Sequence, residues 1–361
     1  MNKFDEMINL KRGTGYLYVK DHARAFLAPD MGARVFVELD GLLQHRLDLE
    51  NVYNPNKPFN NYGGNNFWPA PEGGQFGFNY KGDTWYVQPA INNEPFLLES
   101  QHQAGATVFK KMVLENRKGI KLDILMTRKF SVSSLSSTIQ NLHPSKGFSY
   151  EVEDRIEVLN KVSSQDALLA CWTLEQFEAS EFTHSFIKVQ NPAHSINYDF
   201  YEDPRNKITY GSRGVFYKTD SKQKGQIGIR KEAQPECIGF YDLQRKLLCM
   251  REIIGEAEGV YFNIADNEQA EGPFSAADMY SIFNGQEEMG FFELETIGGA
   301  DIQNGSLKGS RLISRTSFGL FESTVPIERF ISKLKQPDNQ AIKDIQSREE
   351  TIPVYEYLER E

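Results

Sequence analysis

Two glutamates lie close together in the stretch 289-MGFFELETIGGA-300, which is typical of a β-strand. In an extended strand Glu293 and Glu295 point to one face, while Phe292 and Leu294 point to the other. Two carboxyl groups about 7 Å apart on one face can divide the roles of acid and base when their surroundings separate their pKa values. A solvated strand face is the alternative, and the pattern alone does not decide between them.

The stretch 62-YGGNNFWPAPEGGQFGF-78 combines five glycines, two prolines and five aromatic residues around Glu72. Gly and Pro break a helix, so we predict a rigid loop. Asn65 and Asn66 each offer a donor and an acceptor, as a hydroxyl-rich ligand requires, and the Trp68 ring could stack on the C–H face of a sugar. The alternative is a buried structural turn in which backbone N–H groups satisfy the carboxylate.

Two other stretches are further candidates for ligand contacts. The stretch 167-ALLACWTLEQF-177 is a nearly apolar strand that carries Trp172, and core packing is the alternative explanation. The stretch 276-AADMYSIFNG-285 is predicted to be a polar loop before the strand with the glutamate pair, with Asp278 and Asn284 as contacts. A polar loop needs no function, so alternatives stay open here too.

Composition and charge exclude several classes of function. The net charge is −10 without a basic block, which argues against nucleic acid and anionic membrane surfaces as partners. The three cysteines give no disulfide framework, and the six scattered histidines have no zinc-ligand spacing. We therefore expect no cofactor or metal, although an acidic cleft could recruit calcium through carboxylate and carbonyl oxygens.

The hydrophobic pattern along the chain predicts an all-β fold. Apolar residues alternate with polar ones in short segments separated by Gly, Asn, Asp and Pro turns, as in a sandwich of many strands. The segments are 15–20, 24–28, 34–39, 107–116, 120–132, 150–159, 214–219, 226–231, 247–254, 260–265, 290–297 and 311–321. We predict one large β domain over residues 1–325.

Helical periodicity is clear only near the end of the chain. The stretch 326-PIERFISKLKQ-336 has an early proline and one apolar face. Residues 326–361 are therefore predicted to be a helical segment with a polar tail. The N-terminus MNKFDEMINLKRG has no apolar signal-peptide region, which indicates a cytoplasmic address, or a periplasmic one if an export signal has been removed.

Three motifs in this order resemble the galactose mutarotase-like superfamily of aldose 1-epimerases and their relatives. They are the G-G-x-x-x-W-x-x-P-E stretch that ends at Glu72, the D-R-I-E-V-x-N strand at 154–160 and the E-L-E-T strand at 293–296. The similarity runs over about residues 10–325 and is strongest to a branch from sugar-degrading bacteria. The resemblance implies a β-supersandwich with a sugar cleft on a concave sheet. It also implies that Glu295, in a late L-E-T motif, is the general base.

The chain departs from the superfamily at both of its histidines. The stretch 72-EGGQFGF-78 with Trp85 is similar to an early H-G-G-x-x-G-F…W motif, but Glu72 replaces the histidine. The second histidine is expected near 170-ACWTL-174, where Trp172 stands instead. Glu72 or Glu293 then becomes the candidate acid, if burial raises its pKa.

The sequence therefore leaves three hypotheses for a protein whose partner is a carbohydrate. The first is an epimerase-like isomerase with Glu295 as base and Trp68 and Trp172 as sugar platforms. Arg34 would hold a carboxylate or phosphate of the substrate, or is simply a strand residue. The second hypothesis is a non-catalytic sugar-binding or sensing protein, and the third is a lyase or hydrolase on the same fold. The sugar and the oligomeric state are not specified.

Overall fold

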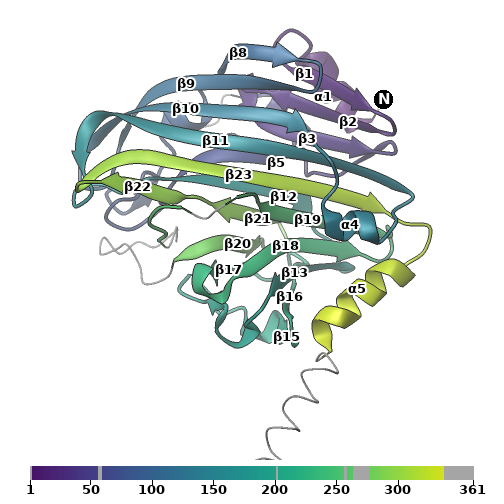
Figure 1. Ribbon diagram of the computed structural model, residues 1–361. Coiled ribbons are helices and arrows are strands. Elements are labelled where there is room, and N and C mark those ends of the chain that lie inside the picture. The colour runs from purple at the N-terminus through teal and green to yellow at the C-terminus, as the bar shows by residue number, and fades with distance from the viewer. Residues whose placement is uncertain (1, 56–58, 201, 256–257, 263–276, 337–361) are drawn as a thin grey trace, which may run out of the picture.

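The computed structural model describes residues 2–55, 59–200, 202–255, 258–262 and 277–336. Two large antiparallel sheets stack face to face with the main hydrophobic core between them (Figure 1). One has 10 strands and the other has 11. The predicted all-β sandwich is confirmed.

The first sheet has the strand order β1-β2-β3-β5-β12-β21-β20-β17-β14, with β4 paired to β3. Its strands are β1 (Tyr16–Lys20), β2 (Ala23–Ala28), β3 (Arg34–Leu39), β4 (Leu42–Leu43), β5 (Gly64–Ala70), β12 (Ala170–Glu178), β14 (Ile196–Asn197), β17 (Gly225–Arg230), β20 (Asp278–Asn284) and β21 (Phe291–Ile297). Strands β5, β12 and β21 lie at its centre, so segments far apart in the sequence meet there.

The second sheet has the order β15-β16-β13-β18-β19-β23-β11-β10-β9-β8, with β22 paired to β23. Its strands are β8 (Leu97–His102), β9 (Gly105–Glu115), β10 (Lys121–Val132), β11 (Lys146–Ser163), β13 (Thr183–Val189), β15 (Ile208–Tyr210), β16 (Gly214–Lys218), β18 (Pro235–Asp242), β19 (Leu247–Ile253), β22 (Gly299–Gln303) and β23 (Ser306–Leu320). The short strands β6 (Tyr80–Lys81) and β7 (Thr84–Trp85) form a separate hairpin.

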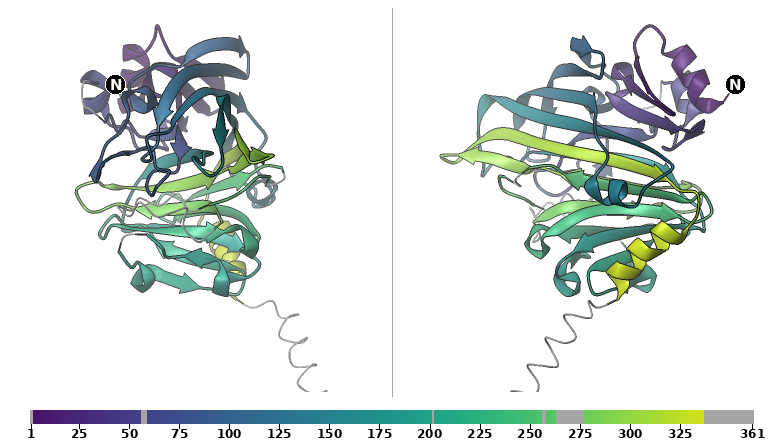
Figure 2. Two further views of the ribbon diagram at one scale, coloured as in Figure 1. Left: turned by 90° about the vertical axis from the view of Figure 1, so that its left-hand side faces the viewer. Right: turned by 45° about the vertical axis from the view of Figure 1, so that its right-hand side comes forward.

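Helices cover the outer sides of the sandwich (Figure 2). They are α1 (Lys3–Leu10), α2 (Leu49–Tyr53), α3 (Pro89–Asn92), α4 (Ser137–Asn141) and α5 (Val325–Lys335). The apolar face of α5 packs against Phe186 and Phe216 of the second sheet, and α1 packs against Phe26 and Phe36 of the first. The predicted C-terminal helix is confirmed, while residues 337–361 lie outside the described residues.

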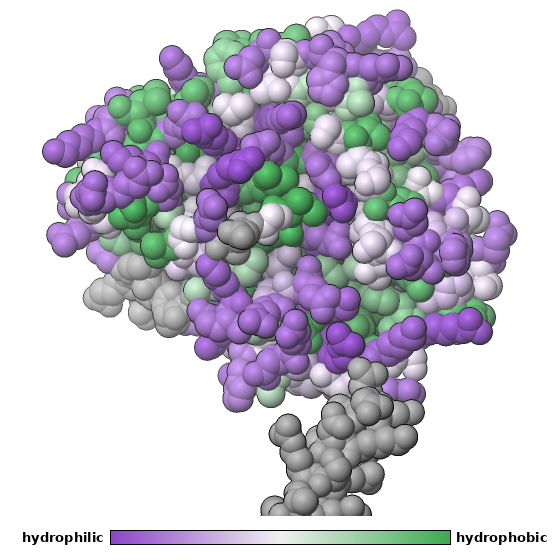
Figure 3. Space-filling model, viewed as in Figure 1, coloured by the Kyte–Doolittle hydropathy of each residue, from purple (hydrophilic) through white to green (hydrophobic). Residues whose placement is uncertain are grey.

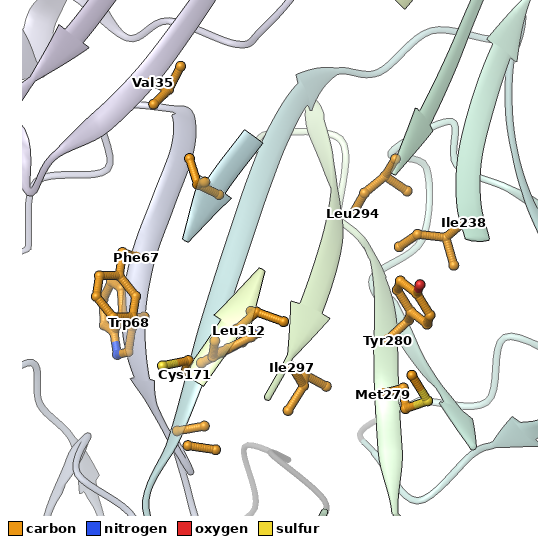
Figure 4. Close-up of a cluster of buried hydrophobic side chains, with 14 of the residues drawn as sticks. Val35, Phe67, Trp68, Cys171, Ile238, Met279, Tyr280, Leu294, Ile297 and Leu312 are labelled. Atoms are coloured by element: carbon orange, nitrogen blue, oxygen red, sulfur yellow. The ribbon is translucent and has the colours of Figure 1, made fainter. Parts of the chain in front are cut away.

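The core follows directly from the alternation of side chains along each strand. Figure 4 shows part of it, with Val35, Phe67, Cys171, Leu294 and Leu312 contributed by β3, β5, β12, β21 and β23. All three cysteines are buried free thiols. The face of the molecule seen in Figure 3 is mostly hydrophilic, with hydrophobic side chains in small separate groups.

A buried polar network interrupts this core and connects the two sheets. The Glu175 carboxylate of β12 accepts hydrogen bonds from His45 Nε2 (2.7 Å), Thr316 Oγ1 (2.7 Å), Tyr150 Oη and Arg251 Nη1. Burial opposes ionisation of Glu175, but Arg251 and the His45 hydrogen bond outweigh it and lower its pKa to about 2. The carboxylate therefore stays ionised and fully hydrogen-bonded between the sheets.

A second buried pair extends the network toward β5. Arg128 donates to Asp154 at 2.7 and 2.8 Å, and the same guanidinium donates to the Asn65 side-chain oxygen at 3.0 Å. Asn65 in turn donates to Tyr150 Oη at 3.0 Å. Polar side chains thus cross-link β5, β10, β11 and β12 in the interior.

Two predicted loops prove to contain central strands. Residues 64–70 of the glycine-rich stretch form β5, which pairs with β12 along its length. Gly63 and Gly64 adopt φ values of +90° and +70° before the alternating pattern begins. Residues 278–284 form β20, whose side chains are all buried. Although the polar residues suggest a loop, apolar and polar residues alternate here, and this alternation suits a strand that packs on both of its faces. In the predicted strand 260–265, Val260 forms an isolated bridge with Ala300, and residues 263–265 lie outside the described residues.

The buried network makes a prediction about stability. Arg251→Met leaves the Glu175 carboxylate without its counter-charge, so we expect a loss of about 3–5 kcal/mol in the free energy of unfolding. Urea denaturation at pH 7 measures the change. The double variant Arg251→Met/Glu175→Gln should recover part of the loss, because no unpaired buried charge remains.

The matched control is Arg311→Met, which breaks an exposed ion pair with Glu153 (2.7 Å). That change should cost no more than about 1 kcal/mol. Equal losses for the buried and the exposed pair would contradict the role assigned to Arg251.

Candidate functional site

A cavity of about 440 Å³ opens on the face of the first sheet that points away from the second sheet. It contains all three tryptophans of the chain, three glutamates, five side-chain amides, two cations and five apolar side chains. The lining residues are Trp68, Trp85, Trp172, Glu72, Glu293, Glu295, Asn61, Asn66, Gln176, Gln226, Gln286, Arg34, Lys224, Phe59, Leu174, Phe283, Met289 and Phe291. A cavity of this volume, lined by aromatic, amide and charged side chains together, suits a small polar ligand.

Strand register places the central lining residues in rows across β5, β12 and β21. Trp172 lies opposite Trp68, and Gln176 lies opposite Glu293. Leu174 pairs with Asn66 on one side and with Glu295 on the other. The strands are antiparallel and their side chains alternate, so these residues share one face.

The two strand glutamates form a coupled pair at the floor of the cavity. Glu293 and Glu295 are 8% and 1% exposed, and the two carboxyl groups are close enough to influence each other's titration. Burial raises the pKa of both carboxyl groups, and the neighbouring Glu293 raises the pKa of Glu295 further. Two adjacent buried carboxyl groups cannot both ionise at low cost, so the pair holds a proton more tightly than an isolated carboxyl group in water does.

Side-chain donors hold each carboxyl group of the pair in place. Gln176 Nε2 donates to Glu293 Oε1 at 2.6 Å, and Trp172 Nε1 donates to Glu295 Oε2 at 3.0 Å. Gln226 Nε2 approaches the same Glu295 oxygen at 3.3 Å. The carboxyl groups are therefore oriented by β12 and β17 before any ligand arrives.

Positive charge lies on the Glu293 side of the pair. Arg34 and Arg46 both favour the ionised form of Glu293. Arg34 is 1% exposed, donates to Gly63 O at 2.9 Å, and keeps a buried Nε without a hydrogen-bond partner. Burial lowers the pKa of Arg34 to about 9, so the side chain remains a cation at neutral pH.

Aromatic rings form one wall of the cavity. Trp68 packs edge-on against Trp172 at 6.5 Å and against Phe59 at 5.8 Å between ring centroids. Trp85, from the β6–β7 hairpin, is 41% exposed and donates from Nε1 to Glu72 Oε1 at 3.0 Å. Glu72 is thereby held at the rim by a tryptophan.

Seven of the ten predicted site residues meet in this cavity and three do not. Asn65 points into the core, because it is adjacent to Asn66 on a strand and must face the other way. Asn284 donates to Gln223 O and accepts from Ser221 N, so its side chain holds a turn. Asp278 accepts from Asn197 Nδ2 at 2.9 Å, and burial raises its pKa to about 8.

The two amides that orient the carboxyl pair, Gln176 and Gln226, were not among the residues predicted from the sequence. Gln176 follows Trp172 by four residues on the same strand. Because side chains alternate between the two faces of a strand, the sequence does predict that Gln176 shares a face with Trp172. Gln226 lies on β17 and reaches the site only through its pairing with β20. No feature of the sequence around Gln226 indicates that it lies beside Glu295.

Neither a metal-binding group of side chains nor a membrane-spanning helix is found among the described residues. No group of three or more His, Cys, Asp and Glu side chains in the described residues is arranged to hold a metal ion. No helix in the same residues is long and apolar enough to cross a membrane.

Residues 41–307 match the sequence model of a family of unknown function, DUF6786. The chain belongs to this family. No curated protein matches it.

Among solved structures, the chain is similar to a galactose mutarotase-like protein from Lactobacillus casei. The identity is 10% and the TM-score is 0.48, over 84% of this chain and 99% of that chain. It is also similar to a galactose mutarotase related enzyme from Lactobacillus acidophilus, with 11% identity and a TM-score of 0.48, over 86% and 98% of the two chains. At these identities the likeness concerns the fold, and no conclusion about the reaction is taken from it.

The raised pKa of Glu295 makes a prediction about pH. A carboxyl group whose pKa is higher in the folded state binds more protons when folded, so stability falls as pH rises above the ordinary value of about 4.3. Glu295→Gln removes this penalty, and the oxygen of the new amide can still accept from Trp172 Nε1. The variant should therefore gain stability over the wild type at pH 8, by on the order of 1 kcal/mol.

Urea denaturation at pH 8 and at pH 4 checks this prediction. The difference between the variant and the wild type should shrink toward pH 4, because the Glu295 carboxyl group then becomes mostly protonated in the unfolded state as well. The same difference at both pH values would show that burial does not shift the Glu295 titration.

Proposed function

We propose that the protein binds a carbohydrate ring in the cavity and exchanges protons with it through Glu293 and Glu295, as an aldose isomerase. One observation carries the proposal. A buried pair of carboxyl groups with raised pKa values faces a cavity that contains every tryptophan of the chain and five side-chain amides. Such a site combines flat apolar surfaces with donors and acceptors, which matches the two kinds of surface on a sugar ring.

The electrostatic surroundings assign different roles to the two carboxyl groups. Arg34 and Arg46 stabilise the ionised form of Glu293. Glu295 instead has Glu293 and Glu72 as its charged neighbours, and both raise its pKa. In the proposal Glu295 therefore carries the shared proton and Glu293 is the carboxylate.

This arrangement supports ring opening of an aldose without a histidine. The Glu293 carboxylate takes the proton of the anomeric hydroxyl as the carbonyl forms and the bond from C1 to the ring oxygen breaks. Glu295 gives its proton to the ring oxygen, so one proton enters the enzyme and one leaves. After rotation of the aldehyde, the reverse transfers close the ring as the other anomer and restore the pair. Each proton transfer contributes roughly 10²–10⁴-fold.

The proposal assigns the base differently from the resemblance, which implies Glu295 in that role. In a coupled pair the two groups exchange roles between ring opening and ring closure, so both are required. Glu72 is not needed as the acid, because it lies at the rim with Trp85.

A second candidate function is sugar binding without turnover. Among the described lining residues there is no histidine, so the superfamily's usual acid has no counterpart of that type. Hydrolysis by the pair is less well supported, because glycosidase carboxyl groups flank the scissile bond at about 5–9.5 Å from each other, whereas Glu293 and Glu295 are neighbours on one face of one strand.

Anomer exchange measured by NMR tests the proposal. A panel of free aldoses and uronic acids is added to the wild type, to Glu293→Gln and to Glu295→Gln. We expect catalysed exchange for at least one sugar and a loss of about 10²-fold or more in each variant. Calorimetry should find that the variants still bind the sugar, because the cavity walls are intact.

The control is Glu72→Gln, which should keep at least a substantial part of the turnover. A wild type that binds sugars but does not accelerate exchange would favour the binding protein. Full activity of both strand variants would remove the pair from the mechanism.

A further inference from the structure

The face of the first sheet that carries the cavity continues into a second pocket of about 400 Å³, here called the outer pocket. Trp172, Leu174 and Gln176 of β12 line the cavity, and Glu178, the next residue on the same face, lines the outer pocket. Two residues of a strand span about 7 Å, so the two spaces are neighbours. Met289 lines both of them.

Arg46 stands between the cavity and the outer pocket. Its guanidinium lies 4.8 Å over the ring of Phe291, and Nη1 donates to Asn61 O at 3.0 Å and to Gln176 Oε1 at 3.1 Å. Asn61, Gln176 and Phe291 line the cavity, whereas Arg46 lines the outer pocket. One side chain therefore contacts the walls of both spaces.

The outer pocket is polar, and its charges are balanced. Arg46 pairs with Asp48 at 3.0 Å, and Lys3 pairs with Glu178 at 3.7 Å. The paired charges leave no surplus of one sign to attract an ionic group, while their remaining donor and acceptor sites suit neutral hydroxyl groups.

We propose that the outer pocket is a second sugar subsite, so that the ligand class is a neutral oligosaccharide of two or more units. This inference rests on the proposed function, because the first unit occupies the cavity beside Glu293 and Glu295. The second unit extends along β12 past Arg46 and Met289. The similar volumes of the two spaces, about 440 and 400 Å³, fit one ring in each.

Calorimetry with matched ligands tests the inference. The probes are D-glucose against maltose, cellobiose and lactose, which all carry glucose at the reducing end. In the wild type we expect at least one disaccharide to bind about tenfold or more tightly than its monosaccharide, which corresponds to about 1.4 kcal/mol. A phenyl ring at Ala179, which lines the outer pocket, would fill it, so Ala179→Phe should remove this advantage and leave monosaccharide affinity unchanged.

A milder pair of variants guards against misfolding of Ala179→Phe. Glu178→Ala removes an exposed wall of the outer pocket and should weaken only the disaccharide, while the neighbouring exposed Glu181→Ala should change neither. If monosaccharides bind and no disaccharide binds more tightly, the subsite is absent and the proposed function stands. If none of the sugars binds, both fail.

Discussion

The buried carboxylate of Glu175 is the interaction on which the rest of the structure depends. It lies on β12 between the sheets and has donors from His45, Tyr150, Thr316 and Arg251. His45 Nδ1 accepts the Val37 N–H at 3.0 Å, so its Nε2 carries the proton that Glu175 accepts. The Arg251 guanidinium is paired with the Glu175 carboxylate.

This network determines which side chains of β12 line the cavity, because successive side chains of a strand point to opposite faces. Glu175 points into the core, so Leu174 and Gln176 must point to the opposite side. If β12 slipped by one residue in its pairing, the Glu175 carboxylate would turn out of the core, and Trp172 and Gln176 would turn into it. The same network holds β5 through Asn65, and so directs Asn66 and Trp68 to the cavity. The polar interior thus fixes the register of two strands that build the site.

The Glu293–Glu295 pair differs from the Glu175 network, because burial of the pair lowers the stability of the fold. Burial raises the pKa of both acids and Glu293 raises that of Glu295 further, so a purely structural strand would be more stable with an amide at one position. Strongly shifted carboxyl groups in a cleft are a common mark of functional sites. The donors from Trp172 and Gln176 hold the pair in a fixed orientation at the floor of the cavity.

Much of this was readable from the sequence, and the failures have physical causes. The period-two pattern predicted the sandwich and the shared face of Glu293 and Glu295. The composition of residues 62–78 suggested a loop, so Asn65 and Asn66 were both assigned to the ligand, although a strand sends them to opposite faces. Gln226 could not be predicted, because long-range strand pairing brings it to the site.

Intrinsic tryptophan fluorescence tests the central claim most directly, because all three tryptophans of the chain line the cavity. Titration of the folded wild type with neutral mono- and disaccharides at pH 7 should give a saturable change in emission for at least one sugar. A folded protein whose emission is unchanged by every sugar, even at millimolar concentration, would contradict a carbohydrate site in this cavity.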